Sequence, residues 1–129
     1  MLMAAEGAVV VSRKGEARVL RGHPWIFRSD IERAKELPTG AIVRVLGSTG
    51  RPLGFAFWSS RSEIRLRIFE RGAELAPSFL RDRLAAALAF REGIVAGAEA
   101  YRVVHGEGDR LPSLVVDRYG EYLVIQTLS

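Results

Sequence analysis

The stretch IVRVLGSTGRPLGFAFWSSRSEIRLRIF, residues 42–69, decides the fold class because it holds three short β-type runs. Ile42–Leu46 and Ile64–Phe69 alternate apolar with basic residues, as half-buried strands do. Leu53–Trp58 is apolar and aromatic, and Gly47–Gly50 is a turn signal. Short strands joined by glycine-rich turns at this spacing predict a small barrel or sandwich.

The segment before this stretch is expected to add a strand and a basic turn. Ala8–Arg13 is a β-branched run, which predicts a first strand. Lys14–Arg21 is short and strongly basic, which favours a helical turn that ends at Gly22. Trp25 is expected in the core, since small barrels need large apolar side chains to fill them.

The periodicity changes after about residue 72, where a helical pattern replaces the alternating one. Residues 78–91 place four apolar residues on one helical stripe, namely Leu80, Leu84, Ala87 and Leu88. Ser78 is the predicted N-cap, Asp82 lies in the predicted first turn, and Gly93 is the predicted stop.

Strand-like runs follow this predicted helix. Tyr101–His105 predicts a strand, Gly106–Pro112 a loop, and Leu114–Asp117 with Tyr122–Leu128 a hairpin around Tyr119-Gly120. The chain would then end on an uncapped apolar strand, an edge that invites aggregation in a complete domain. We therefore expect a piece of a longer protein, whose terminal strand allows dimerisation.

The net charge of +4 is unevenly distributed along the chain. Residues 1–70 hold 12 Lys or Arg against 7 Asp or Glu, whereas residues 71–129 hold 7 against 8. Most of the excess is arginine, whose planar fork matches phosphate oxygens and stacks on bases. A basic unit joined to a neutral one is typical of a nucleic-acid-binding module attached to another part.

Composition excludes several classes of protein. The chain has no cysteine, which removes disulfides, thiolate metal sites and cysteine nucleophiles. No apolar run approaches the roughly 18 to 20 residues that a membrane-spanning helix needs. The start of the chain lacks the basic segment of a signal peptide. We expect a soluble, cytoplasmic protein with no membrane partner.

Three distinctive motifs lie in order along the chain. The first runs from Lys14 to Phe27 and contains LRGHPWIF, and the second is SEIRLR at Ser62–Arg67. The third, at Tyr101–Gly120, reads YRVVHGEGDRLPSLVVDRYG. Together they resemble the RlmI-like family of bacterial large-subunit rRNA cytosine-C5 methyltransferases, which depend on S-adenosylmethionine (SAM).

The resemblance implies a mainly β chain with an α+β part. Residues 1–72 would form a PUA-like small β-barrel that binds RNA, and residues 73–129 part of a central α+β (EEHEE-like) domain. The family's Rossmann-like domain, which binds SAM and carries the catalytic cysteines, has no counterpart here. No catalytic residue or cofactor site is therefore expected in this chain, which we predict to be inactive; SAM is implied for the full-length parent. Ser113 departs from the family's signature, which has glycine there, and weakens any expectation of a special backbone conformation.

The resemblance and the basic first half together predict RNA-contacting residues, namely Arg13, Lys14, Arg18, Arg21, His23, Arg28, Arg65 and Arg67. The basic run would neutralise phosphates, and His23 would stack on a splayed base. Arg65 and Arg67 share one strand face, with Arg44 and Arg61 expected nearby. The alternative for all of these groups is an ordinary solvated surface.

The other polar motifs favour structural roles. Gly106–Asp109 completes no nucleotide-binding glycine pattern and precedes no helix, so we expect a loop in which Asp109 bonds backbone amides. Asp117 is expected to form a local ion pair with Arg118. His23 and His105 are the only histidines, too few for a zinc site.

The sequence therefore predicts the RNA-binding N-terminal region of a SAM-dependent 23S rRNA (cytosine-C5) methyltransferase, which positions rRNA for a catalytic domain outside this chain. Two alternatives stay open. One is a stand-alone PUA-type RNA-binding module without enzymatic activity. The other is an interaction domain whose basic face docks an acidic protein surface.

Overall fold

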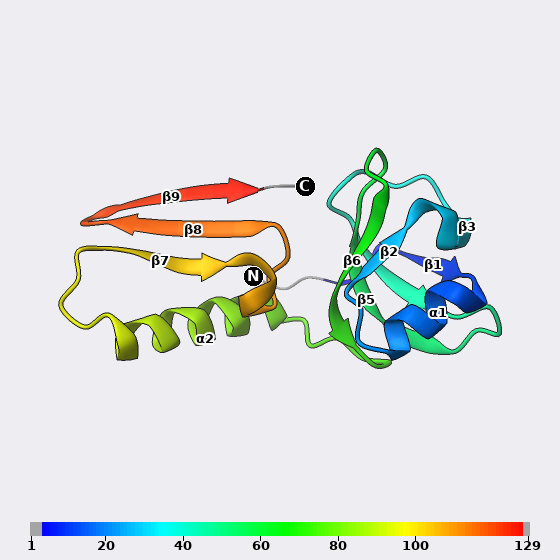
Figure 1. Cartoon of the computed structure of the whole chain (residues 1–129), viewed down its shortest axis with the longest axis horizontal. Coiled ribbons are helices and arrows are strands. Elements are labelled where there is room, and N and C mark those ends of the chain that lie inside the picture. The colour runs from blue at the N-terminus through cyan, green and yellow to red at the C-terminus, as the bar shows by residue number, and fades with distance from the viewer. Residues whose placement is uncertain (1–3, 128–129) are drawn as a thin grey trace. The chain divides into compact units, whose positions relative to one another are not determined.

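The computed structural model describes residues 4–127, which form two compact units that divide after Leu75. Figure 1 shows a curled sheet with a short helix in the first unit. In the second unit, a longer helix lies along a smaller sheet (Figure 1).

The first unit is built on a six-stranded sheet ordered β2-β6-β5-β4-β1-β3. Its strands are β1 (Gly7–Val11), β2 (Trp25–Phe27), β3 (Ile31–Ala34), β4 (Ile42–Leu46), β5 (Pro52–Trp58) and β6 (Ile64–Arg71). The β1–β4 pair is parallel and the other four pairs are antiparallel. Helix α1 (Arg13–Leu20) joins β1 to β2, and the 3-10 turn η1 (Arg28–Asp30) joins β2 to β3.

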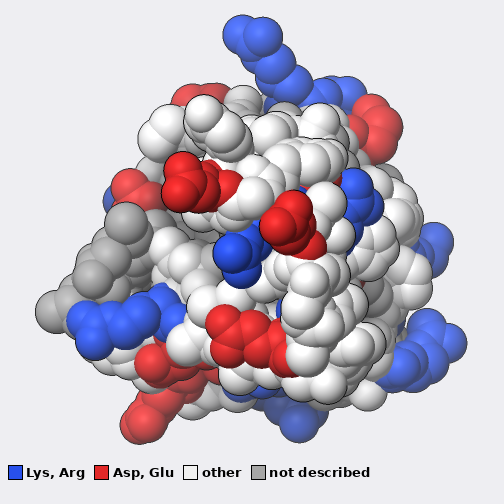
Figure 2. Space-filling view, turned by 90° about the vertical axis from the view of Figure 1, so that its left-hand side faces the viewer, with Lys and Arg blue, Asp and Glu red and all other residues white. Residues whose placement is uncertain are grey.

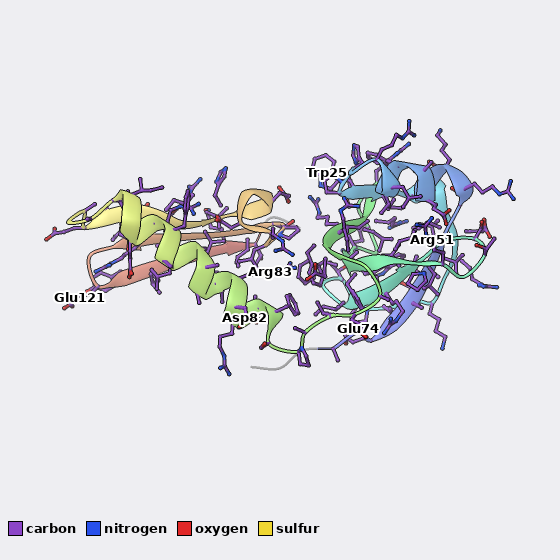
Figure 3. All side chains as sticks on the ribbon, turned by 90° about the horizontal axis from the view of Figure 1, so that it is seen from below. Trp25, Arg51, Glu74, Asp82, Arg83 and Glu121 are labelled. Carbon is purple, nitrogen blue, oxygen red and sulfur yellow. The ribbon has the colours of Figure 1, made fainter. Side chains whose placement is uncertain are left out.

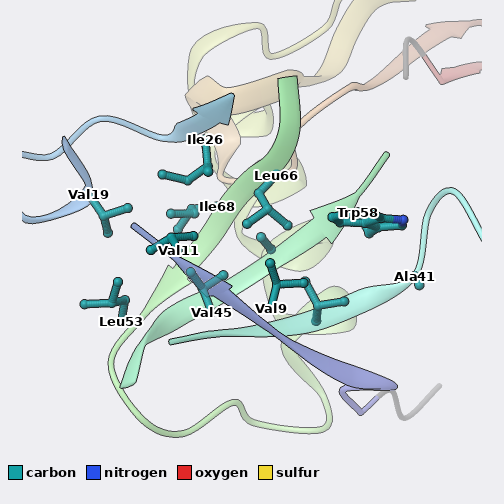
Figure 4. Close-up of a cluster of buried hydrophobic side chains, with 12 residues drawn as sticks. Val9, Val11, Val19, Ile26, Ala41, Val45, Leu53, Trp58, Leu66 and Ile68 are labelled. Atoms are coloured by element: carbon teal, nitrogen blue, oxygen red, sulfur yellow. The ribbon is translucent and has the colours of Figure 1, made fainter. Parts of the chain in front are cut away.

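The curl of this sheet encloses one hydrophobic core (Figure 4). Buried side chains from α1 and from five strands meet there, including Val19, Ile26 and Leu66, each exposed by 1% or less. Full burial of one such side chain stabilises the fold by about 1.5–3 kcal/mol. Leu66 and Ile68 both point into this core, which confirms the alternation predicted for β6.

Helix α1 is fixed at both ends. The Ser12 hydroxyl accepts a hydrogen bond from the Gly15 amide at 3.1 Å, which satisfies one free donor of the first turn. At the other end, Arg71 Nη1 donates to the Val19 carbonyl at 2.6 Å. The predicted helical turn is thus a complete short helix, and the first strand ends at Val11 because Ser12 caps that helix.

A close approach between β5 and β6 requires glycine at position 54. Gly54 has φ +154°, and a Cβ there would lie 2.2 Å from the Glu70 carbonyl oxygen. Any side chain would therefore force the two strands apart. The β5–β6 register shifts between Phe55 and Ala56, directly after this glycine.

The second unit contains helix α2 (Phe79–Ile94) and a three-stranded antiparallel sheet ordered β7-β8-β9. Its strands are β7 (Ala100–His105), β8 (Leu114–Tyr119) and β9 (Tyr122–Thr127), with the 3-10 turn η2 (Gly106–Asp109) between the first two. The predicted order of helix, strand, loop and hairpin is confirmed. Leu128, the predicted end of the last strand, lies outside the described residues.

The helical stripe packs on the sheet only in part. Leu80, Leu84 and Ala87 belong to the core of the second unit, together with Val104 and Val116. The prediction for Leu88 was wrong, because its side chain is 39% exposed.

One predicted end of α2 is confirmed and the other needs correction. Ser78 is the N-cap residue, as predicted, although its hydroxyl donates to the Asp82 carboxylate at 2.9 Å and does not cap a backbone amide. Gly93 does not stop the helix, which continues to Ile94.

The fold class agrees with the prediction: a curled, mainly β unit is followed by a unit that combines one helix with a small sheet. Among residues 4–127, no helix has the length and apolar character to cross a membrane.

Candidate nucleic-acid interface

The structure distributes the eight predicted RNA-contacting residues over three places in the first unit. Arg13, Lys14 and Arg21 lie on α1 and at its end. Arg18, His23 and Arg67 surround the aromatic side chains of β2. Arg28 and Arg65 line a cleft beside β3.

The first group, which we call the helix group, consists of Arg13, Lys14 and Arg21. All three side chains are exposed. The only hydrogen bond described for their side chains runs from Arg21 Nε to the Ala17 carbonyl at 3.3 Å. These three cations are therefore accessible to phosphate groups.

Arg18 differs from the helix group because its charge is already paired. Its Nη1 lies 3.1 Å from Asp30 Oδ2, and the two side chains are only 22% and 4% exposed. The guanidinium also lies over the Phe27 ring, 5.0 Å from the centroid. Arg18 thus holds α1 against η1, and this pairing competes with any phosphate contact.

A basic–aromatic cluster, made of His23, Trp25, Phe27 and Arg67, lies at the free edge formed by β2. Trp25 pairs with Arg67 across the β2–β6 ladder, and the guanidinium lies 5.8 Å from the Trp25 ring centroid. The His23 ring meets both Trp25 and Phe27 at centroid distances of 6.2 Å. Its Nδ1 accepts a hydrogen bond from the Trp25 amide at 3.2 Å, which fixes the ring beside the indole.

The prediction that Trp25 fills the core was wrong. Its side chain is half-buried and lies at the margin of the first unit (Figure 3), whereas Trp58 is a core residue at 7% exposure. The reason is strand alternation, because Ile26 takes the inward position on β2. Trp25 Nε1 and Arg67 Nε are buried and have no hydrogen-bond acceptor among the described residues.

Arg28 and Arg65 form the third group. Arg28 is exposed and faces Glu63 at 3.9 Å, an ion pair too open to neutralise it fully. Arg65 is half-buried and donates from Nη1 to the carbonyls of Ser59 and Ser60. Neither Arg65 nor Arg67 is a fully solvated side chain of an amphipathic strand.

The expectation that Arg44 joins Arg65 and Arg67 finds no support in its contacts. Arg44 lies on β4, where it stacks on Phe55 at 5.0 Å and donates to the Ala73 carbonyl at 3.0 Å. Its guanidinium therefore fastens the segment after β6 to the sheet.

The acidic residues of the second unit hold its loops together. Asp109 accepts two hydrogen bonds from Arg91, at 2.9 and 2.8 Å, and one from the His105 amide at 2.7 Å. Burial alone would raise the pKa of Asp109, but the Arg91 and His105 hydrogen bonds outweigh it and leave the pKa below its ordinary value. The predicted backbone contact of Asp109 is confirmed.

The predicted ion pair between Asp117 and Arg118 was wrong, since neighbouring residues of β8 point to opposite faces. Asp117 instead pairs with Arg102 of β7 at 2.8 Å, and that hydrogen bond lowers the pKa of Asp117. Arg118 bonds the Gly120 carbonyl at 2.9 Å and lies over the Tyr101 ring.

Residues 106–109 do not fit a SAM site. They form a 3-10 turn between two strands, and the Asp109 carboxylate is fully engaged by Arg91 and His105. Within the described part of the chain, no group of three or more His, Asp or Glu could hold a metal ion.

Comparison with known proteins shows what the first unit resembles. Residues 9–71 match the family model described as a PUA-like domain. The first unit is similar to that family over these residues, and we refer to it below as the PUA-like domain. The match begins in β1 and ends in β6, so it includes the helix group, the basic–aromatic cluster and the cleft.

Curated relatives match beyond the PUA-like domain. The chain is 37% identical over 126 residues to ribosomal RNA large subunit methyltransferase I of Tolumonas auensis. It is 32% identical over 126 residues to the protein of the same name from Salmonella gallinarum. These alignments cover 94% of this chain but only 32% and 31% of the relatives, so the chain spans about a third of their length. The resemblance found in the sequence is confirmed.

Solved structures share the fold of the chain. A Streptococcus mutans protein assigned as a SAM-dependent methyltransferase matches with a TM-score of 0.71. The match covers 92% of this chain and 32% of the Streptococcus mutans chain. Another protein assigned as a methyltransferase, SMU.776, was crystallised with SAH and matches with a TM-score of 0.75. This match covers 95% of this chain and 33% of the SMU.776 chain. Both are 17% identical to this chain, so they show a shared fold and no more.

The second unit offers no comparable basic surface on the side seen in Figure 2. Acidic and basic side chains are interspersed there among uncharged ones. This distribution matches the near balance of charge in residues 71–129 and leaves the PUA-like domain as the basic part of the chain.

Sequence reasoning missed two parts of the candidate interface. It assigned Trp25 to the core, because β2 has only three residues and its sequence does not show which of them faces inward. It also missed β3, whose residues Ile31–Ala34 show no clear alternation, and with it the basic residues Arg33 and Lys35 of the cleft.

Proposed function

We propose that this chain is the RNA-binding region of a SAM-dependent 23S rRNA methyltransferase and that its PUA-like domain holds an unpaired segment of rRNA. The observation that carries the proposal is the basic–aromatic cluster, in which Arg67 and His23 flank Trp25 at the margin of the domain. Sequence-specific RNA recognition targets unpaired bases that stack on aromatic rings and guanidinium planes.

The two kinds of contact would divide the work of binding. The helix group would neutralise phosphates, a contribution that is independent of sequence and weakens with salt. The basic–aromatic cluster would stack on a base, a contribution of about 1–3 kcal/mol per base that depends less on salt. Together they would position the RNA for a methyl transfer to cytosine elsewhere in the whole protein, which is the proximity component of catalysis.

The remaining chemistry is proposed to lie outside residues 4–127. SAM would supply the methyl group, and its site is assigned to another region because residues 106–109 do not fit it. The relatives named as ribosomal RNA large subunit methyltransferases support this division, since each is about three times as long as this chain. Action on ribosomal RNA would place the protein in the cytoplasm.

The proposal is tested by fluorescence anisotropy with labelled single-stranded and duplex pieces of large-subunit rRNA, from about 50 to 200 mM salt. We expect the variant Lys14→Ala/Arg21→Ala to bind more weakly and with a shallower salt dependence, and Trp25→Ala to lose affinity for single strands mainly. The matched control is Arg51→Ala/Arg81→Ala, which removes two exposed cations outside the three groups. Equal losses in both double variants would contradict the assignment, as would the absence of binding at low salt.

A further inference from the structure

The connection between the two units is bonded to the first unit beyond the end of β6. Seven residues, 72–78, connect β6 to α2, and the units divide within this segment, after Leu75. The Gly72 amide donates to the Leu53 carbonyl at 3.3 Å, and Arg44 Nη1 donates to the Ala73 carbonyl at 3.0 Å. The chain therefore stays attached to the PUA-like domain for two residues after its last strand.

Arg44 is suited to this contact because its side chain already has a fixed platform. It lies on β4 opposite Phe55 of β5, and its guanidinium stacks on the Phe55 ring, 5.0 Å from the centroid. Phe55 is only 2% exposed. A guanidinium that stacks by its flat face keeps the N–H groups at its edge free to donate. Arg44 therefore holds the Ala73 carbonyl with little further loss of side-chain freedom.

The other end of the connection is restrained by the start of α2. Pro77 has a fixed φ and disfavours a helical conformation at Ala76, and the Phe79 amide donates to the Ala76 carbonyl at 3.0 Å. Between the two restrained ends lie Glu74, which is labelled in Figure 3, and Leu75. Neither of these two residues makes a hydrogen bond to the described part of the chain.

We propose that Arg44 is a positioning residue that confines the hinge between the two units to Glu74 and Leu75. Its hydrogen bond to Ala73 fixes the point at which the chain leaves the PUA-like domain. Without Arg44, the hinge would extend back toward β6 and include up to four residues, 72–75. Two extended residues span at most about 7 Å and four span about 14 Å, so the loss would double the reach of the hinge.

The consequence of this inference for methyl transfer rests on the proposed function. RNA that is bound by the PUA-like domain has to be presented to a catalytic part elsewhere in the whole protein, and such proximity depends on how tightly the two parts are tethered. Arg44 belongs to none of the three groups of candidate RNA-contacting residues. Its removal should therefore loosen the tether while the RNA affinity of the chain stays within about twofold of that of a control that also lacks one exposed cation.

The test measures the distance between the units by double electron–electron resonance. The chain has no cysteine, so spin labels attach only at introduced ones, in the pair Thr49→Cys and Glu92→Cys, whose positions are exposed. We expect Arg44→Ala to broaden the distance distribution by roughly 1.4-fold, because the extent of a flexible segment grows with the square root of its length. Arg61→Ala, which removes another exposed arginine of the same domain, is the matched control and should leave the distribution unchanged.

A second measurement follows cleavage of the connection by a glutamate-specific protease, with the products identified by mass spectrometry. Glu74 is the one glutamate of residues 72–78. Loss of one hydrogen bond should make cleavage after Glu74 about fivefold faster in Arg44→Ala than in Arg61→Ala. Thermal unfolding of the PUA-like domain checks that both variants are equally folded.

The outcomes separate this inference from the proposed function. An unchanged distance distribution and an unchanged cleavage rate in Arg44→Ala would overturn the hinge and leave the proposed function standing. A loss of RNA affinity well beyond that of Arg61→Ala would make Arg44 part of the RNA-binding surface and would also overturn its role as a positioning residue. If the unaltered chain bound no RNA while Arg44→Ala broadened the distribution, the hinge would stand and the proposed function would fail.

Discussion

Two residues other than glycine, Arg110 and Ser113, have left-handed backbone conformations within the described chain, with φ of 59° and 66°. Both lie in the loop between η2 and β8. Ser113 stands where the resembled family has glycine, and its conformation is the one that glycine adopts without a Cβ penalty. The substitution had weakened the expectation of a special backbone conformation, but the conformation is present.

Ser113→Gly is predicted to stabilise the second unit by about 0.5–1 kcal/mol, because glycine adopts the left-handed conformation without strain. The greater conformational entropy of glycine in the unfolded chain offsets part of this gain. The substitution also removes a hydroxyl that is buried without a partner among the described residues. Urea unfolding measures the gain in the free energy of unfolding, and the slope of this free energy against urea concentration should stay unchanged. Ser113→Ala is the control, since it removes the hydroxyl and keeps the strain; an equal gain in both variants would contradict the explanation.

Arg18→Ala is predicted to destabilise the PUA-like domain by about 3–5 kcal/mol, because it leaves the buried Asp30 carboxylate without its partner. Lys14→Ala, on the exposed face of the same helix, should change stability by less than about 0.5 kcal/mol. Thermal unfolding of the two variants compares them directly. Equal stabilities would mean that the Arg18–Asp30 pair does not hold α1 in place.

At the scale of elements, alternation was sufficient to predict most strands of the chain. Ile42–Leu46 was predicted with its observed bounds, and the hairpin around Gly120 was located correctly. The end of α2 could not be predicted, because Gly93 has no atom within 4 Å of its would-be Cβ and is simply tolerated in the helix. Contacts between distant residues, such as Arg102 with Asp117 and Arg71 with Val19, depend on tertiary register that a single sequence does not contain.

The attachment of α2 to η2 is predicted to be sensitive to acid. The pKa of Asp109 lies below its ordinary value in the folded chain. The carboxylate therefore contributes its full stabilisation of the fold above the unfolded carboxyl pKa of about 4. This stabilisation is lost as the pH falls through the lower pKa of the folded chain. Asp109→Asn should therefore destabilise the second unit at pH 7 by about 1–3 kcal/mol, and less at low pH.

Unfolding followed between about pH 2 and pH 7 tests this prediction, since the window spans the unfolded pKa of Asp. Asp117→Asn is the matched control on the same sheet, and its effect at pH 7 should be smaller because its partner Arg102 is 47% exposed. A constant difference between Asp109→Asn and wild type at every pH would show that the carboxylate charge is not what fastens α2.

At the scale of the whole molecule, β9 is the least covered element that the structure describes. Tyr122, Leu123, Val124 and Ile125 are 46–76% exposed, although β9 pairs with β8 along its length. We predict that this chain associates with itself at high concentration and that Ile125→Lys reduces the association, because edge charges oppose strand pairing. Sedimentation velocity measures it, with Leu88→Lys as a control on α2; a monomer at all concentrations would contradict the prediction.

The charge and the fold of the two units both agree with the proposed assignment of RNA binding to the first unit. The first half of the sequence carries the excess of basic residues, and the matching PUA-like domain contains all eight predicted RNA-contacting residues. Composition predicted which unit is basic. It could not predict that Arg18 would be paired with Asp30 or that Trp25 would lie outside the core.

The most direct test of the central claim is photo-crosslinking of the chain to single-stranded rRNA that contains 4-thiouridine, followed by mass spectrometry of the peptide adducts. The account predicts adducts in residues 13–28 and 58–67, with a loss of the first set in Trp25→Ala. Adducts confined to residues 76–127, or none at a saturating RNA concentration, would contradict the claim that the PUA-like domain is the RNA-binding part of this chain.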